Sequence, residues 1–140
     1  MIATCTVYGV LKLAARIASI LGAMGDYELI ESQAGEVKKA FRNRFVTPSG
    51  HLAGDSQSIY VAALHHKMLE THERQIAQDR LIELLKEGNY HADVVPGVLR
   101  ALLPTLTEAG RLDLAYMVLL QTSQPTRLAR NQLIPRPNIA

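Results

Sequence analysis

The amino-acid sequence predicts an all-α protein of about six helices. Through most of the 140 residues, apolar side chains recur at every third or fourth position, which is the period of an α-helix with one buried face. No segment of the sequence alternates apolar and polar residues as a half-buried β-strand does. Short and longer loops alternate between the expected helices, and this order predicts stacked antiparallel helical hairpins.

The first expected helix spans residues 2–24 and is strongly apolar. Lys12 and Arg16 interrupt it, so it falls short of the about 18 uncharged residues of a membrane span. No charged start precedes the apolar block, which argues against a secretory signal. We therefore expect a buried helix and no membrane contact. Its apolar positions at helical spacing are Val7, Val10, Leu11, Ala14, Ala18 and Leu21.

A second helix is expected to follow, with Asp26 as its N-cap. Its apolar stripe consists of Ile30, Ala34, Val37, Phe41 and Phe45. Its C-terminal part is basic, which suits the negative end of a helix dipole, and we expect this end to be solvated. The basic residues are Lys38, Lys39, Arg42 and Arg44.

The segment FVTPSGHLAGDSQ, residues 45–57, joins this helix to a third one. Its small and polar residues leave two interpretations open, a connector between packed helices or an active-site loop. Asp55 is expected to be the N-cap of the third helix. The apolar positions of that helix are Ile59, Ala63, Leu64 and Met68.

Three further helices are expected. The fourth starts at Thr71 and ends at the C-cap Gly88. The fifth has Pro96 in its first turn, and Pro104 is expected to kink it or shift its start. Gly110 separates it from the sixth. The apolar positions are Ala77, Leu81, Leu84 and Leu85 in the fourth, Val98, Leu99, Leu102, Leu103 and Leu106 in the fifth, and Leu112, Ala115, Val118 and Leu119 in the sixth.

Composition indicates one helical domain over residues 1–121 and a tail over residues 122–140. The tail holds three of the six prolines and no sustained period, so it is expected to be irregular or disordered. A net charge of +2, without a basic run interleaved with aromatic residues, argues against nucleic-acid binding. The single cysteine, Cys5, cannot form an internal disulfide, which fits a reducing compartment, and we expect a cytoplasmic protein.

Residue chemistry alone identifies no reaction centre, metal site or cofactor. His65 and His66 are adjacent on a helix, so their side chains diverge and cannot chelate one ion. The carboxylates Asp79, Glu83 and Glu87 share one helical face, which is expected to be a solvated stripe rather than an acid/base pair. Cys5 lies in an apolar helix without a neighbouring cation and is expected to be an inert thiol. Ser49, Ser56 and Ser58 lie near His51 and Asp55, but no GxSxG motif is present.

Several longer stretches nevertheless resemble one family. The segments AARIASILG, VKKAFRNRFVTPSGHLAGDSQSIYVAAL, LIELLKEGNYH and LLPTLTEAGRLDLAYMVLLQTSQP occur in that order. Together they resemble the catalytic domain of the family 78 α-L-rhamnosidases, the six-hairpin glycosidases, from about residue 8 to residue 125. The most specific pieces are F-x-N-R-F followed by G-x-L-x-G-D-x-Q, and L-T-E-A-G-R-x-D-L-A-Y.

The resemblance implies a partial (α/α)6 barrel, with about three of its six hairpins. It implies descent from enzymes that remove terminal rhamnose with inversion, using one acidic residue as general acid and another as general base across a water. Both motifs of that pair lie outside the matched part, and the tryptophan-containing base motif cannot occur in a chain without tryptophan. No catalytic residue is therefore assigned, and the chain by itself is expected to be inactive.

The resemblance also suggests three sugar-binding residues, Asp55, Gln57 and His91. His91 begins HADVVPGVL, where the family usually has H-L-x-T-G-x-x-G-T in a loop that faces the sugar pocket. The expected ligand is a rhamnoside or another glycan. Near the end, QPTR at residues 124–127 replaces the family's Y-P-S-W, and the similarity stops.

Two alternatives remain beside a partial glycosidase domain. The chain could be a non-catalytic helical module for protein interaction or sugar binding, or a piece of a longer gene. Three hairpins of a closed ring would leave helix faces and two lateral edges exposed, and large exposed apolar patches are uncommon on soluble monomers. We therefore expect a homo-oligomer or the tail to cover these faces, and a two-fold dimer would regenerate a ring.

Overall fold

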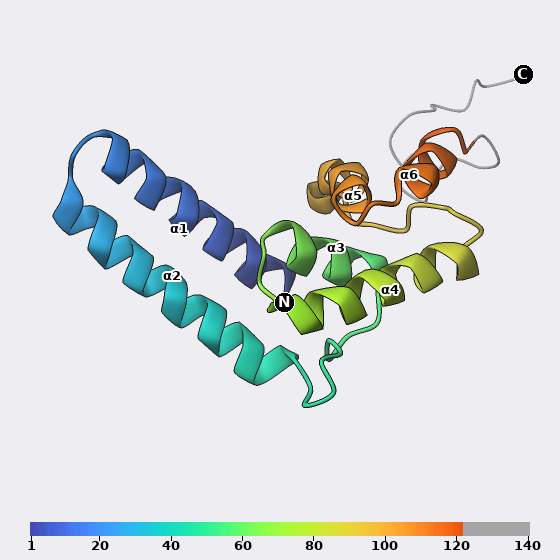
Figure 1. Cartoon of the computed structure of the whole chain (residues 1–140), viewed down its shortest axis with the longest axis horizontal. Coiled ribbons are helices and arrows are strands. Elements are labelled where there is room, and N and C mark those ends of the chain that lie inside the picture. The colour runs from blue at the N-terminus through green and yellow to red at the C-terminus, as the bar shows by residue number, and fades with distance from the viewer. Residues whose placement is uncertain (122–140) are drawn as a thin grey trace, which may run out of the picture.

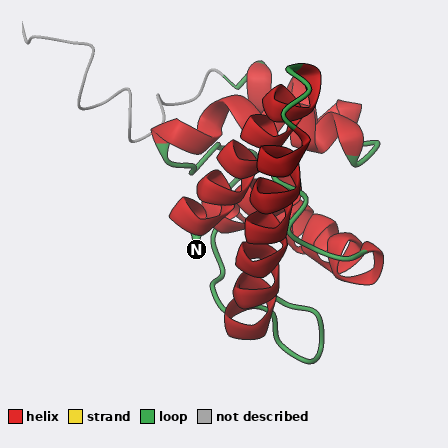
Figure 2. Ribbon diagram, turned by 90° about the vertical axis from the view of Figure 1, so that its left-hand side faces the viewer, coloured by secondary structure: helices red, strands yellow, loops and turns green. Residues whose placement is uncertain are grey.

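The computed structural model describes residues 1–121, and these residues form six α-helices. The helices are α1 (Ile2–Ile20), α2 (Met24–Phe45), α3 (Gln57–His65), α4 (Thr71–Glu87), α5 (Pro96–Glu108) and α6 (Leu112–Leu119). Within this part of the chain the only strand-like feature is an isolated bridge between Val46 and Leu52, and Figure 2 shows helices and loops. The prediction of six helices without a strand is confirmed for these residues.

The helices pair into three hairpins, α1–α2, α3–α4 and α5–α6, with α3–α4 in the middle (Figure 1). Helix α3 also packs against α1 and α5, so these three helices form one layer. The starts of α1 and α5 both lie close to the start of α3. Met1, just before α1, lies beside Gly54 in the loop that leads into α3. The N–H of Val95, just before α5, donates a hydrogen bond of 2.9 Å to Oγ of Ser58 in the first turn of α3.

Helix α3 is the centre of the core. Seven of its nine residues are buried, including both polar residues of its first turn, Gln57 and Ser58. A helix that is apolar almost all round can be stable only where neighbours cover every face. The large core side chains around its Tyr60 come from four other helices and from the loop after α3, and the fully buried ones are Phe41, Met68, Leu69, Leu81, Leu85, Leu102, Leu106 and Leu114.

Helix α1 contradicts the expectation of a buried helix. Only Cys5, Ala15 and Ala18 are buried among its 19 residues, because α2 and α3 cover one side of it. Five of its large apolar side chains are exposed instead: Val7, Val10, Leu13, Ile17 and Ile20. By length and a mean hydropathy of 1.2 alone, α1 is the one helix in the described residues that could cross a membrane, a test that core helices also pass.

Four helices end in the same backbone motif. In each case the residue after the C-cap has a positive φ, and the next N–H bonds back to the carbonyl five residues earlier, as in a Schellman motif. Glycine takes this position after α1 and α5, at Gly22 and Gly110. Lys67 and Asn89 take it after α3 and α4, with φ of 54° and 49°. Gly88 is the C-cap of α4, as predicted, but the left-handed residue is its neighbour Asn89.

Three predicted helix signals act differently in the structure. Asp26 lies in the first turn of α2, whose N-cap is Ala23. Asp55 is not the N-cap of α3, because Ser56 holds that position and the Asp55 carboxylate binds Arg80 of α4. Helix α5 runs through Pro104, so this proline does not move the helix start. The tail, residues 122–140, lies outside the described part of the chain.

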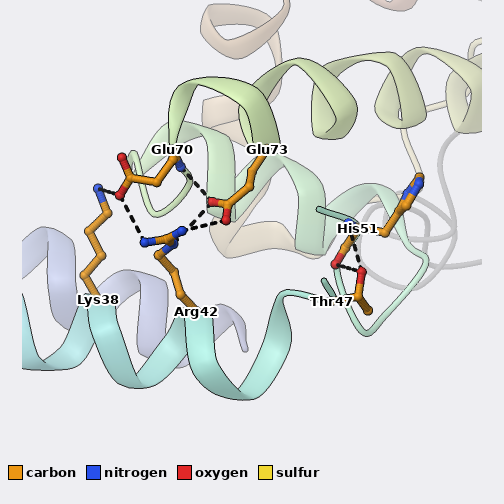
Figure 3. A network of polar contacts seen from close by, with 6 residues as sticks. All are labelled: Lys38, Arg42, Thr47, His51, Glu70 and Glu73. Carbon is orange, nitrogen blue, oxygen red and sulfur yellow. Dashed lines mark hydrogen bonds and ion pairs between the residues drawn. The ribbon is translucent and has the colours of Figure 1, made fainter. Parts of the chain in front are cut away.

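A charged network joins the second half of α2 to the start of α4 (Figure 3). Arg42 makes two bonds to Glu73, Nη2–Oε1 of 2.7 Å and Nε–Oε2 of 3.3 Å. Oε1 of Glu70 forms ion pairs with Nη1 of Arg42 at 3.3 Å and with Nζ of Lys38 at 3.7 Å. Glu70 and Glu73 also form the capping box of α4. The expectation of a wholly solvated basic helix end is therefore wrong for Lys38 and Arg42.

The pKa of Glu73 reflects these contacts. Burial favours the neutral acid, but the hydrogen bonds from Arg42 and from the Glu70 N–H outweigh it and hold the pKa of Glu73 below its usual range. The pKa of this carboxyl is lower in the folded chain than in the unfolded chain. Its ionised form therefore stabilises the fold at pH values above its unfolded pKa, which is about 4.3. This contribution is lost as the pH falls through the folded pKa.

We expect Glu73→Gln to lower the free energy of unfolding by about 1 kcal/mol at pH 7, because the side chain can still cap α4 but no longer carries the charge that binds Arg42. Glu73→Ala removes both roles and is expected to cost about 2 kcal/mol. Urea unfolding measures both values. The exposed Glu36→Gln is the matched control, with a change within about 0.5 kcal/mol. Equal losses for all three variants at pH 7 would contradict this assignment.

Candidate functional site

The loops that precede α3 and α5 meet at one end of the helix layer, and two of the three predicted sugar-binding residues lie there. Gln57 is 6% exposed and joins the loops. Its Nε2 donates to the carbonyls of His91 (3.1 Å) and Leu84 (3.4 Å), and its Oε1 accepts the Asp93 N–H at 2.9 Å. Both the nitrogen and the oxygen of the Gln57 amide therefore hydrogen-bond to backbone groups. These bonds hold the loop from His91 to Val95 against α3.

Asp55, the third predicted residue, binds Arg80 through two bonds, Oδ2–Nη2 of 2.6 Å and Oδ1–Nε of 2.9 Å. The same guanidinium reaches Glu83 at 2.9 Å and Glu87 at 3.0 Å. Bonding to Arg80 lowers the pKa of Asp55, so this carboxylate is ionised at neutral pH. Glu83 and Glu87 are exposed, in agreement with a solvated stripe.

The structure thus brings Gln57 and His91 together but gives Asp55 a separate partner. The His91 carbonyl, not its imidazole, makes the contact with Gln57. None of the three residues lines the cavities described below. A role for them in sugar binding stays a prediction, and their established roles are to hold loops and helices together.

A cavity of about 350 Å³ lies between α1, α3 and α5, and no residue of α2, α4 or α6 lines it. Its size is that of a small-ligand site, which begins at about 300 Å³. It is lined by Thr6, Gly9, Val10, Leu13, Ala62, His65, His66, Gly97, Val98, Arg100 and Ala101. The polar lining is basic, and no carboxylate contributes to it.

His66 lies at the wall of this cavity and approaches α1 closely. A Cβ added to Gly9 would lie 2.3 Å from His66 Nδ1, so the imidazole occupies the space that the glycine leaves free. Burial lowers the pKa of His66, and the charges of His65 and Arg100 add to this effect. The ring is therefore neutral at pH 7, so one of its nitrogens can donate a hydrogen bond and the other can accept one.

Sequence reasoning missed this cavity and its residues. The one signal that could have indicated it is Gly9, a glycine inside an otherwise periodic helix, which often marks a close approach of another element. The two histidines diverge as predicted, with their rings edge to face at 5.0 Å between centroids.

Other reactive groups in the described residues do not form a reaction centre. Burial raises the pKa of the Cys5 thiol to about 11, so it stays protonated at neutral pH and is a poor nucleophile, in agreement with the prediction. No group of three or more His, Cys, Asp or Glu side chains is arranged to hold a metal within residues 1–121. Three further cavities have one carboxylate each in their lining: Glu70, Glu31 and Glu108.

Replacement of Gln57 tests its structural role. We expect Gln57→Ala to lower the free energy of unfolding by about 2 kcal/mol, because the Asp93 N–H and the His91 carbonyl lose their partner next to the core. Gln33→Ala, an exposed change on α2, is the control and should stay within about 0.5 kcal/mol. Urea unfolding with hydrogen exchange at the Asp93 amide provides the measurement. An unchanged exchange rate at that amide would contradict the assignment.

A pair of glycine variants tests the approach of His66 to α1. Gly35→Ala, in the open interior of α2, should stabilise the chain by about 1 kcal/mol through helix propensity. Gly9→Ala should instead destabilise it by about 1–3 kcal/mol, because the new Cβ displaces the His66 ring.

In a His66→Ala background, Gly9→Ala should become stabilising by about 1 kcal/mol, because the obstruction is gone. The four free energies of unfolding form a double-mutant cycle. A cycle without coupling would show that the ring does not occupy this space.

Comparison with known proteins identifies the origin of the domain. Residues 1–129 match the family model of the bacterial alpha-L-rhamnosidase six-hairpin glycosidase domain. An α-L-rhamnosidase of Streptomyces avermitilis is 34% identical over 114 residues, which are 81% of this chain and 11% of that protein. An α-L-rhamnosidase of Alteromonas sp. (strain LOR) is 31% identical over 116 residues, 81% of this chain and 13% of that protein. The chain spans only about an eighth of the length of these relatives.

Solved structures agree with the sequence relatives. The Streptomyces avermitilis α-L-rhamnosidase, complexed with L-rhamnose, superposes with a TM-score of 0.82 and 33% identity over 89% of this chain and 12% of that one. Native α-L-rhamnosidase from Aspergillus terreus gives a TM-score of 0.79 at 22% identity, over 83% of this chain and 14% of that one, and shows the fold alone.

These matches confirm the predicted fold class, six helices that correspond to part of a six-hairpin domain. The family match includes α1 from its first residue, so α1 is a helix of this domain despite its apolar surface. The chain belongs to the family of bacterial α-L-rhamnosidase six-hairpin glycosidase domains.

Proposed function

We propose that this chain is a non-hydrolytic segment of a six-hairpin α-L-rhamnosidase-type domain, which supplies three adjacent hairpins of the ring. One observation supports the proposal: none of the four cavities described above has two carboxylates in its lining. An inverting glycosidase needs two carboxyl groups about 6.5–9.5 Å apart, one as acid and one as base, on either side of the bond that breaks.

The electrostatics of the cavity between α1, α3 and α5 support the same conclusion. Its polar lining comes from Thr6, His65, His66 and Arg100, and the positive charge of Arg100 opposes the positive charge that develops on the sugar during glycoside cleavage. The carboxylates Asp55 and Glu73 bind arginines elsewhere and have lowered pKa values. A general acid requires the opposite, a carboxyl with a raised pKa.

The resemblance to α-L-rhamnosidases assigns terminal rhamnosides as the ancestral substrate class. The relative from Streptomyces avermitilis was solved with L-rhamnose, and that sugar is the natural probe for this chain. The Gln57 amide already bonds to the backbone of His91 and Asp93, so it offers little to a sugar. We therefore propose that the chain has an assembly role rather than a sugar-binding role.

An assay with an aryl α-L-rhamnoside tests the first part of this proposal. The purified chain should release the aryl alcohol no faster than buffer, because acid and base are lacking. The full-length Streptomyces avermitilis relative is the positive control. Turnover that scales with the concentration of the chain through successive purification steps would overturn the proposal.

Isothermal titration calorimetry with L-rhamnose tests the second part. No saturable heat is expected up to about 10 mM sugar, which corresponds to a binding free energy weaker than about −3 kcal/mol. Saturable binding that is lost in Arg100→Ala, or in Gln57→Ala, would favour the alternative of a sugar-binding module and would locate the site in the cavity or in the loops.

A further inference from the structure

The cavity between α1, α3 and α5 differs from the other three described cavities in its charges. In each of those three, an arginine shares the lining with a carboxylate: Arg42 with Glu70, Arg16 with Glu31, and Arg74 with Glu108. The cavity between α1, α3 and α5 is lined by Arg100, and no carboxylate among the described residues contributes to its wall. In this part of the chain, its lining therefore contains a cation without a counter-ion.

Arg100 does not find a carboxylate elsewhere in the described part of the chain either. Arg42, Arg80 and Arg111 each bind a carboxylate at 2.6–2.8 Å, whereas Arg100 forms no ion pair within residues 1–121. Arg100 is exposed, and an exposed guanidinium by itself holds an anion weakly, because water screens the pair. A ligand that binds here must therefore also contact the rest of the wall.

Most of that wall is apolar. Its aliphatic side chains come from all three helices: Val10 and Leu13 from α1, Ala62 from α3, and Val98 and Ala101 from α5. A volume of about 350 Å³ has room for a ligand with several carbon atoms. The wall therefore complements a hydrocarbon body, while the guanidinium complements an anionic group.

His66 adds a hydrogen-bonding group that is held in place by packing. Its ring occupies the space beside Gly9 of α1. Burial lowers the pKa of His66, and the nearby charges of His65 and Arg100 lower it further, so the neutral ring has one N–H to donate. No hydrogen bond within residues 1–121 uses this ring. A carboxylate has two oxygens, so it can accept from the guanidinium and from the imidazole at the same time.

We propose that this cavity binds a small monocarboxylic acid with a hydrocarbon body. The carboxylate binds Arg100 and His66, and the hydrocarbon packs against the aliphatic wall. L-rhamnose has no anionic group, so it does not belong to this ligand class. The site goes beyond the proposed function, because its binding does not depend on whether the chain hydrolyses rhamnosides.

Titration of the purified chain with sodium hexanoate, followed by proton–nitrogen correlation NMR at constant ionic strength, tests the proposal. We expect saturable shifts with a Kd at or below about 1 mM. The largest shifts should occur at the amides that surround the cavity, in residues 9–13, 62–66 and 97–101. No saturation up to about 10 mM hexanoate, or saturable shifts confined to other residues, would overturn the proposal.

Two analogues separate the two halves of the ligand. Acetate has the charge without the hydrocarbon body, and hexanamide has the body without the charge. Each should bind at least about tenfold more weakly than hexanoate, because each loses one of the two contacts. Equal binding of acetate would indicate an exposed cation only, and equal binding of hexanamide an apolar cavity only. Either result would contradict the proposed ligand class.

A pair of arginine variants tests the role of the charge. Arg100→Met keeps a long apolar side chain and removes the guanidinium. It should weaken hexanoate binding by about tenfold and leave hexanamide binding unchanged, because only the anion needs the charge. Arg44→Met is the matched control, since Arg44 is an exposed arginine that lines none of the four cavities. Equal hexanoate affinities of the two variants would exclude Arg100 as the anion-binding group.

A second pair of variants supplies the missing carboxylate from α1. Val10 is 60% exposed, so Val10→Glu and Val10→Gln should both keep the helix content measured by circular dichroism. The two new side chains have nearly the same size, but only the glutamate repels hexanoate and competes for Arg100. Val10→Glu should therefore bind hexanoate about tenfold more weakly than Val10→Gln. Equal affinities would show that the anion is not held in this cavity.

Discussion

The burial of α3 is the constraint on which the other elements depend. Helix α3 has apolar or hydrogen-bonded polar residues on nearly every face, so its stability in water requires neighbours on all sides. Helices α1 and α5 flank it in the layer, and α4 covers its outer face. A short helix of nine residues is marginal by itself, so this packing, rather than intrinsic propensity, keeps it folded.

Polar contacts set the register of the elements around α3. Gln57 and Ser58 start the helix and bind the backbone before α5, while Asp55, just before it, binds Arg80 on α4. The ion pairs of Arg42 with Glu70 and Glu73 do the same for α2 and α4. The side chains of Asp55 and Gln57 therefore act in this chain as connectors, since their polar atoms already bond within the protein.

Much of the candidate site could not be read from the sequence, for a physical reason. The helical period identified six helices, and the turns at Thr71, Gly88 and Pro96 were placed correctly, because these signals are local. The pairing of Arg42 with Glu73, 31 residues away, and the approach of His66 to Gly9 depend on how helices cross. Helical spacing also assigned a buried stripe to α1, whereas its burial depends on which neighbours are present.

The sequence by itself determined the helical class, the order of the hairpins and the family, since periodicity, helix-end residues and motif spacing are properties of the chain. The tertiary structure alone decided that α1 and α6 turn apolar side chains outward and that Arg100 and two histidines line one cavity. Burial and electrostatic environment arise only when segments distant in the sequence come together, so no local pattern contains them.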